Sequence, residues 1–181
     1  MRQLGGVDSA MVILVRVDDR LLHGQIICSW VPYLKADSLI VCSDEAASDK
    51  LLSGIMSECA SDGLSVHVDK VDDAVRRMRE ADNGRTILVV GALKDAVRVY
   101  DAGLTFSSLN IGNVHHEENG RRITQSVILD NEDEAIIQRL GERGVKIDIR
   151  DVPTREAVEY SPAPDAKDCR NGDDYNAGRD R

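Results

Sequence analysis

Short apolar runs rich in β-branched residues alternate along most of the chain with segments whose apolar residues follow helical spacing. The strand-like runs are 12–17, 38–42, 64–68, 86–90, 108–111 and 145–149. The helical segments between them are 21–35, 44–60, 71–82, 93–102 and 131–143. Strands that are apolar along most of their length and alternate with helices form mostly parallel sheets buried on both faces. The pattern therefore predicts an α/β fold: an open, mostly parallel, doubly wound sheet with helices on both faces.

The first helical segment carries one apolar stripe, formed by residues at every fourth position: Leu22, Ile26, Trp30 and Leu34. Such a stripe faces the protein interior, so we expect Trp30 to anchor this helix on the sheet. Asp44 is a candidate helix N-cap, because its carboxylate can accept a hydrogen bond from a free backbone N–H. Gly144 follows the last helical segment, where a helix C-terminal stop belongs.

Three segments depart from this rhythm. Residues 114–128 have the pattern of a hairpin, with Glu118, Asn119 and Gly120 supplying the turn. Residues 1–10 are an extension, either disordered or upstream of a true start at Met11. Residues 161–181 are rich in Pro, Asp, Asn and Gly and have too little apolar surface to offset ordering entropy, so we expect a disordered tail. The predicted folded domain is 11–160.

Composition excludes some classes of function and cellular location. The 181 residues suit a single domain, and 32 acidic against 23 basic residues give a formal charge of -9, which argues against nucleic-acid binding. No apolar run approaches the roughly 20 residues of a membrane span. The first ten residues have no apolar signal-peptide core, so we expect a cytoplasmic protein. The four cysteines include no CxxC pair, which makes structural zinc improbable.

One loop holds several side chains that could take part in a reaction. Between the first strand and the first helix stand Asp18, Asp19, Arg20 and His23. Ligands of doubly wound sheets bind at the carboxyl ends of strands, and the following helix start favours anions. Arg20 suits a phosphoryl group, and a neutral imidazole at His23 can attack one. Either carboxylate could orient the imidazole while the other caps the helix. The competing interpretation is a solvated surface histidine beside a salt-bridge cluster.

Other polar positions are weaker candidates. His115 and His116 are adjacent in an extended segment and so point to opposite faces, and we expect no metal site there. Asn110 and Gly112 follow a strand, but no GxGxxG or P-loop pattern is present. We therefore expect no cofactor.

The sequence of this loop also resembles a segment of a known protein family. RVDDRLLHGQIICSWV (16–31) resembles the active-site segment of IIB subunits of the mannose/fructose/sorbose family of the bacterial sugar phosphotransferase system, usually R-[IV]-D-D-R-L-[IL]-H-G-Q-V followed by Trp. The segments 39–49, 108–133 and 144–153 are similar to other parts of that family. One departure is the loop 90–95, where the family often has Asn-Pro; this loop is expected to border the same crevice.

The resemblance implies a function for the chain. It implies a phosphotransferase with a phosphohistidine intermediate: His23 accepts a phosphoryl group from phosphorylated IIA and donates it to a sugar carried by the membrane IIC and IID subunits. It assigns Arg20 to the phosphate, and Asp18 and Asp19 match the motif. Further candidates are Arg16, Gly24 and Gln25 for phosphate binding and Asn110, Gly112 and His115 for the rim of the site.

The alternative function is a regulatory phosphohistidine module that signals to another protein without a dedicated transporter. Both functions require the same residues. Under either one, membrane association is peripheral and occurs only through partners, and no nucleic acid is involved. The sugar and the existence of a homodimer stay open at this point.

Overall fold

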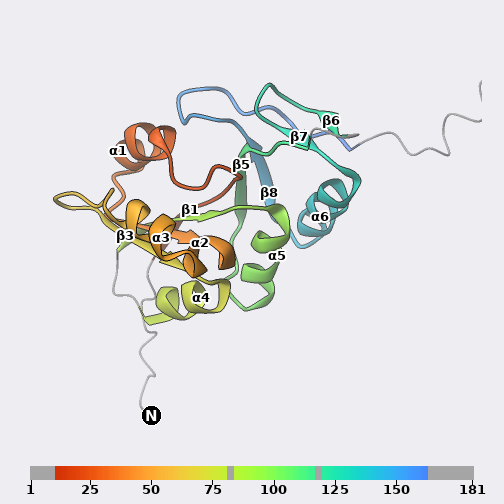
Figure 1. Ribbon diagram of the computed structural model, residues 1–181. Helices are drawn as coiled ribbons and strands as arrows, with labels where there is room; N and C mark the ends of the chain where they lie inside the picture. Colours follow the sequence, from red (N-terminus) through yellow and green to blue (C-terminus); the bar gives the residue numbers. More distant parts are fainter. Residues whose placement is uncertain (1–10, 81–83, 117–119, 163–181) are drawn as a thin grey trace, which may run out of the picture.

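The computed structural model describes residues 11–80, 84–116 and 120–162. A six-stranded sheet crosses the molecule in the order β3-β2-β4-β1-β5-β8, and each neighbouring pair is parallel (Figure 1). The strands are β1 Met11–Asp18, β2 Ser38–Cys42, β3 Ser65–Asp69, β4 Arg85–Val90, β5 Ser108–Asn113 and β8 Lys146–Ile149. All six expected strands are present, with no end shifted by more than two residues.

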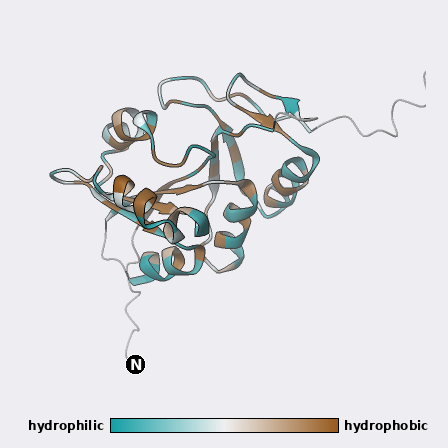
Figure 2. Cartoon of the chain, viewed as in Figure 1, coloured by the Kyte–Doolittle hydropathy of each residue, from teal (hydrophilic) through white to brown (hydrophobic). Residues whose placement is uncertain are grey.

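Helices cover both faces of this sheet, which confirms the doubly wound architecture. They are the π-helical segment η1 Ile26–Trp30, α1 Val31–Leu34, α2 Asp44–Ser48, α3 Lys50–Ser57, α4 Val71–Glu80, α5 Leu93–Asp101 and α6 Asn131–Glu142. Buried residues of α4, α5 and α6 pack into one core cluster, and those of η1 and α3 pack into another. Figure 2 shows hydrophobic and hydrophilic sides on α4, α5 and α6, whereas the ribbon of α3 is largely hydrophobic, and Leu51, Leu52 and Ile55 of that helix are exposed.

The alternation of side chains along β1 decides where its polar residues lie. Val15 and Val17 belong to the core cluster of α4–α6. Arg16 and Asp18, two residues apart from each other, therefore project from the opposite face, which η1 covers. Both polar side chains are completely buried. A central strand thus carries a charged pair into the layer beneath the first helix.

The first helix begins later than its apolar stripe predicts. Leu21 has a φ of 54°, in the left-handed region that a leucine rarely adopts. Its N–H donates to the carbonyl of Asp18, 2.9 Å away, and so closes a turn at the end of β1. Helical backbone starts only at Gly24 and continues through η1 and α1. Residues 19–23 are therefore a loop at the carboxyl edge of the sheet, where the motif predicted a site.

The second helical segment is broken in two. Asp49 has extended backbone (φ -90°, ψ 104°), and its carboxylate accepts hydrogen bonds from the N–H groups of Leu51 and Leu52. Asp49 therefore caps α3, which the apolar periodicity of 44–60 could not indicate. Asp44 does not cap its own helix, because Ser43 does so; its carboxylate accepts from Val71 N at the start of α4 instead.

A hairpin follows β5, as expected for this segment. The strands β6 Arg121–Arg122 and β7 Ile128–Leu129 pair antiparallel, so the chain reverses between 123 and 127. Residues 117–119, which include two of the expected turn residues, lie outside the described part of the chain. Gly144 has a φ of 84° directly after α6, as the expected helix stop requires.

The segment after β8 returns along the edge of the sheet. Val158 N donates to Ile149 O, and Arg121 reaches the carbonyl of Ser161. The expected extension 1–10 and most of the expected tail, 163–181, lie outside the described residues. Among the helices of the described ranges, none is long and apolar enough to cross a membrane.

Candidate active site

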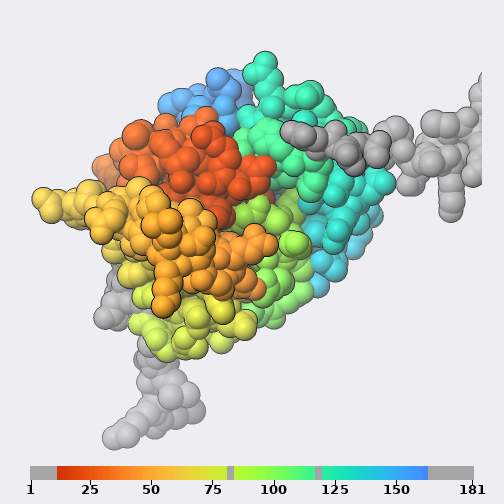
Figure 3. Space-filling model, in the orientation of Figure 1, coloured from red at the N-terminus to blue at the C-terminus, as the bar shows by residue number. Residues whose placement is uncertain are grey.

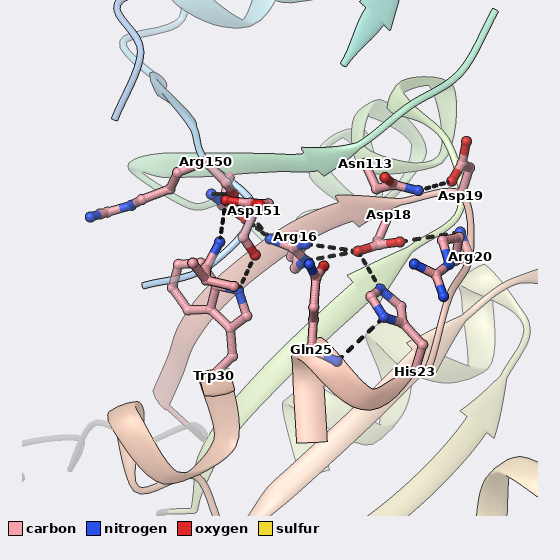
Figure 4. Close-up of polar contacts among 12 residues, drawn as sticks. Arg16, Asp18, Asp19, Arg20, His23, Gln25, Trp30, Asn113, Arg150 and Asp151 are labelled. Atoms are coloured by element: carbon pink, nitrogen blue, oxygen red, sulfur yellow. Dashed lines mark hydrogen bonds and ion pairs between the residues drawn. The ribbon is translucent and has the colours of Figure 1, made fainter. Parts of the chain in front are cut away.

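The loop after β1 forms the candidate site, at the end of a strand that lies between β4 and β5. The β1–η1 segment, red in the space-filling view, reaches the surface of the molecule (Figure 3). Figure 4 shows the side chains of this loop and of the strand ends beside it. The connections of β1 and β4 cover opposite faces of the sheet, and the carboxyl edge at such a switch point is where open α/β sheets bind ligands.

Asp18 and His23 form the centre of the site. Nε2 of His23 lies 2.9 Å from Oδ2 of Asp18, whose side chain is completely buried, whereas the His23 side chain is 10% exposed. The other ring nitrogen, Nδ1, faces the backbone N–H of Gln25 at 3.4 Å, a long contact (Figure 4). Of the two carboxylates that sequence analysis left as alternatives, Asp18 is the one that contacts the imidazole.

Asp18 is held from below by Arg16. The guanidinium donates to Oδ2 of Asp18 from Nε at 3.1 Å and from Nη2 at 2.8 Å. Burial lowers the pKa of Arg16, and the charge of Asp18 acts in the opposite direction. Because it projects beneath η1 and is completely buried, Arg16 does not face the open loop as a phosphate-binding residue would. Asp18 thus joins a buried cation to the imidazole.

Two of the three expected rim residues also lie below the loop. Asn110 is 1% exposed; its Oδ1 accepts from Arg16 Nη1 at 2.6 Å, and its Nδ2 donates to the carbonyls of Asp148 and Arg150. Gly112 is buried, and a Cβ placed on it would lie 1.9 Å from Cζ of Arg16. The strand pairing places both under the arginine, because Arg16 is in register with Asn110.

Asp19 points away from His23 and joins the ends of β1 and β5. Its Oδ1 accepts from the side-chain amide of Asn113, and its Oδ2 lies 2.9 Å from the backbone N and 3.0 Å from Nδ1 of His115. His115, with 43% of its side chain exposed, is the expected rim residue that does lie at the surface beside the loop. Asp19 caps no helix, in contrast to one alternative from the sequence.

Arg20 is the exposed cation of the loop. Its backbone N–H donates to Asp18 Oδ1 at 3.2 Å, but its guanidinium forms no hydrogen bond or ion pair with any residue in the described ranges. Gly24, where helical backbone begins, is exposed, and a Cβ there would meet nothing within 4 Å. An unpaired guanidinium and the N–H groups of a helix start beside an imidazole can together hold an anion.

Residues that sequence reasoning did not assign to the site support it from the far side. Trp30, buried as expected, donates from Nε1 to the carbonyl of Asp151. Its ring lies 5.5 Å from the guanidinium carbon of Arg16 and 5.9 Å from that of Arg150. The position of Arg150 and Asp151 directly after a predicted strand was an available signal, since carboxyl ends of parallel strands share one edge.

His116 lies in a separate cluster beside the site. Its Nε2 is 2.7 Å from Asp133 Oδ2 and its Nδ1 is 3.5 Å from Asp130 Oδ2. Burial and the neighbouring Asp130 raise the pKa of Asp133, and His116 opposes that shift. These three side chains converge closely enough to hold a metal ion, but ion pairing of the imidazole with both carboxylates accounts for the same arrangement. The expected absence of metal stays a prediction.

Two surface depressions differ in whether residues of the candidate site line them. One of about 160 Å³ is lined by Asp19, His115 and residues 91–94, so the loop after β4 does border the crevice, as expected. A larger one of about 810 Å³ lies between β3 and α4, lined by His67 and Arg77 among others, and it includes no residue of the β1 loop. The chemistry-bearing residues therefore belong to the smaller crevice and the open loop.

Comparison with known proteins assigns the family. The family described as PTS system sorbose subfamily IIB component matches residues 12–171, beyond the expected domain end at 160. The chain is 30% identical over 151 residues to the N-acetylgalactosamine-specific phosphotransferase enzyme IIB component 2 of Escherichia coli K12, covering 82% of this chain and 95% of that protein. It is also 30% identical over 146 residues to the sorbose-specific EIIB component of Lacticaseibacillus casei, covering 80% and 89%.

Solved structures agree with this assignment. The IIB domain of the sorbose permease from Klebsiella pneumoniae superimposes with a TM-score of 0.76 at 27% identity, over 82% of this chain and 92% of that one. The sheet, the loop after its central strand and the sequence match all point to one family. The chain belongs to the sorbose subfamily of IIB components of the sugar phosphotransferase system.

Proposed function

We propose that the chain is a cytoplasmic phosphocarrier: His23 accepts a phosphoryl group from phosphorylated IIA and donates it to a sugar carried by membrane IIC and IID subunits. The observation that carries the proposal is the contact between His23 Nε2 and the buried carboxylate of Asp18, 2.9 Å long. Membership in a family of phosphotransferase components supports the reaction class.

The contact with Asp18 supports Nδ1 as the reacting nitrogen. Oδ2 of Asp18 accepts two N–H groups from Arg16 and Oδ1 accepts the backbone N–H of Arg20, so both oxygens of the carboxylate act as acceptors. Nε2 of His23 must therefore be the donor, and the neutral ring keeps its lone pair on Nδ1. In the proposed first step the bond between phosphorus and the donor's nitrogen breaks as a bond to Nδ1 forms. In the second step a sugar hydroxyl oxygen bonds to phosphorus as the bond to Nδ1 breaks, and the hydroxyl proton is released to water.

Groups around Nδ1 are suited to the transferred phosphoryl group. The Gln25 N–H already faces Nδ1 at 3.4 Å and can donate to a phosphoryl oxygen once the nitrogen is bonded to phosphorus. The Arg20 guanidinium, unpaired within the described ranges, supplies a bidentate cation for the equatorial oxygens. His115 and Asp19 lie on the other side of the β1 end, where we assign them to shaping the crevice.

Reconstituted transfer tests this function. The chain is incubated with phosphoenolpyruvate, the general phosphotransferase proteins and IIA, and then with membranes that contain IIC and IID. We expect one acid-labile, base-stable phosphate per chain and a phosphorylated sugar. His23→Gln should abolish both, whereas His67→Gln, on β3, should abolish neither.

The outcomes separate the two functions considered. Phosphate on the chain but no sugar product with any IIC and IID partner would contradict the transport function and favour the regulatory one. Labelling that persists in His23→Gln would contradict both.

A further inference from the structure

The arginine beneath the site is as fully excluded from solvent as an apolar core residue. Arg16 is completely buried, and its guanidinium donates to Asp18, to Asn110 Oδ1 and, at 3.3 Å, to the carbonyl of Arg150. The ring of Trp30 lies on the helix side at 5.5 Å. A buried charge is tolerated only when it is paired and hydrogen-bonded, so these contacts are needed for the arginine to occupy this position.

Gly112 leaves the space that the guanidinium occupies. A Cβ on Gly112 would stand 1.9 Å from Cζ, 2.0 Å from Nη1 and 2.0 Å from Nη2 of Arg16. Atoms cannot approach this closely, so any side chain at 112 would displace the arginine. The pairing of β1 with β5 is irregular at this point: Val17 pairs with Ile111 but Asp18 with Asn113, which leaves Gly112 as the extra residue. Such irregularities re-aim side chains beside functional sites.

We propose that Arg16, Asn110 and Gly112 are positioning residues that fix the tautomer of His23. Asn110 and Gly112 place the guanidinium, and the guanidinium keeps Asp18 a carboxylate. A carboxylate only accepts, and therefore forces the proton of the neutral imidazole onto Nε2 and leaves Nδ1 as the nucleophile. Without the cation, Asp18 is buried without a counter-charge and takes up a proton. A protonated Asp18 can donate to Nε2, which moves the imidazole proton to Nδ1 and removes the nucleophile.

The tautomer can be measured directly in the unphosphorylated protein. Nitrogen-15 chemical shifts of the His23 ring, recorded at a pH where the ring is neutral, distinguish the protonated nitrogen from the bare one. In the parent chain we expect Nε2 to be protonated. In Arg16→Ala and in Gly112→Ala we expect the ratio of the Nε2–H to the Nδ1–H tautomer to fall by about tenfold or more, which is the effect of losing one charge-assisted hydrogen bond.

Matched variants separate the proposed role from general loss of packing. Gly54→Ala makes the same chemical change on α3, where a Cβ meets nothing within 4 Å, and should keep the parent tautomer. The double variant Arg16→Ala with Gly112→Ala should match Arg16→Ala alone, because the alanine at 112 acts only by displacing the arginine. If alanine at either position prevents folding, Arg16→Lys, which keeps a cation without its fork, should give an intermediate ratio.

The proposal would be overturned if Arg16→Ala and Gly112→Ala fold and keep the parent tautomer. If only Arg16→Lys folds, an unchanged tautomer in that variant would overturn it. The tautomer does not depend on the proposed function, but its consequence for phosphoryl transfer does: the positioning variants should lower kcat for acceptance from IIA and leave KM for IIA unchanged. A shifted tautomer with an unchanged kcat would leave the positioning role intact and contradict transfer at Nδ1.

Discussion

At the scale of single residues, two adjacent aspartates of one motif have different tasks. Asp18 points to the face beneath η1 and contacts His23, and Asp19 points to the crevice and contacts His115. The difference follows from the alternation of side chains at a strand end, where neighbours project to opposite faces. Arg20, next in the chain, has its backbone tied to Asp18 while its guanidinium is free within the described part of the chain.

The freedom of Arg20 leads to a prediction about rate. Arg20→Ala should slow phosphoryl transfer by about tenfold or more, because a guanidinium aligned with the equatorial oxygens stabilises the charge that develops in the transition state. The melting temperature should be unchanged, since the Arg20 side chain is exposed and belongs to neither core cluster. Stopped-flow transfer from phosphorylated IIA and thermal unfolding measure the two quantities.

Arg20→Lys serves as the graded control. A point charge reproduces only part of a bidentate contact, so its transfer rate should fall between those of the parent and the alanine variant. Transfer by Arg20→Ala at the parent rate would show that this arginine takes no part in the reaction.

At the scale of elements, local polar residues determine boundaries that apolar periodicity does not reveal. The helical pattern of 44–60 continues through Asp49, yet that carboxylate accepts two backbone N–H groups and starts a new helix. The strands of the hairpin after β5 are two residues long, too short for a period of two to be visible, so the pattern did not reveal the chain reversal between 123 and 127. The π-helical backbone of η1 likewise has no signature in the apolar stripe.

The cap on α3 gives a prediction about stability. Asp49→Ala should lower the free energy of unfolding by about 1 kcal/mol, the usual cost of removing an N-cap side chain. Asp62→Ala, at an exposed turn before β3, is the matched control and should change it by less than about 0.5 kcal/mol. Urea denaturation of both variants measures the difference. Equal stabilities would mean that the break at Asp49 is held by tertiary packing rather than by the cap.

At the scale of the whole molecule, the sequence predicted the fold and which loop holds the candidate site, but not the network beneath that loop. The spacing of two between Arg16 and Asp18, and again between Asn110 and Gly112, places each pair on one face of its strand. What brings the two pairs together is the register of β1 against β5, which depends on tertiary packing. Arg16 was therefore assigned to phosphate binding, and Asn110 and Gly112 to the rim, although all three lie buried under the loop.

The extent of the folded domain gives a prediction for the whole chain. Both core clusters lie within 11–162. Near the end of this range, the backbone carbonyl of Ser161 accepts a hydrogen bond from Arg121. Residues 1–10 and 163–181 have no periodic apolar face, so a chain of 11–162 should melt within a few degrees of the full chain and accept phosphate at the same rate.

A chain of 11–171, which ends with the family match, is the control for that truncation. If 11–162 were much less stable than 11–171, residues 163–171 would belong to the folded domain. If both truncated chains were destabilised, the first ten residues would contribute to the fold.

The role proposed for His23 is tested most directly by identifying the phosphorylated residue. The full chain is phosphorylated by IIA, digested under alkaline conditions that preserve phosphohistidine, and its peptides are sequenced by mass spectrometry. We expect a single phosphoryl group on His23, on the imidazole that contacts the buried carboxylate of Asp18. A phosphoryl group on His67, His115 or His116, or a chain that takes up none from any IIA partner, would contradict it.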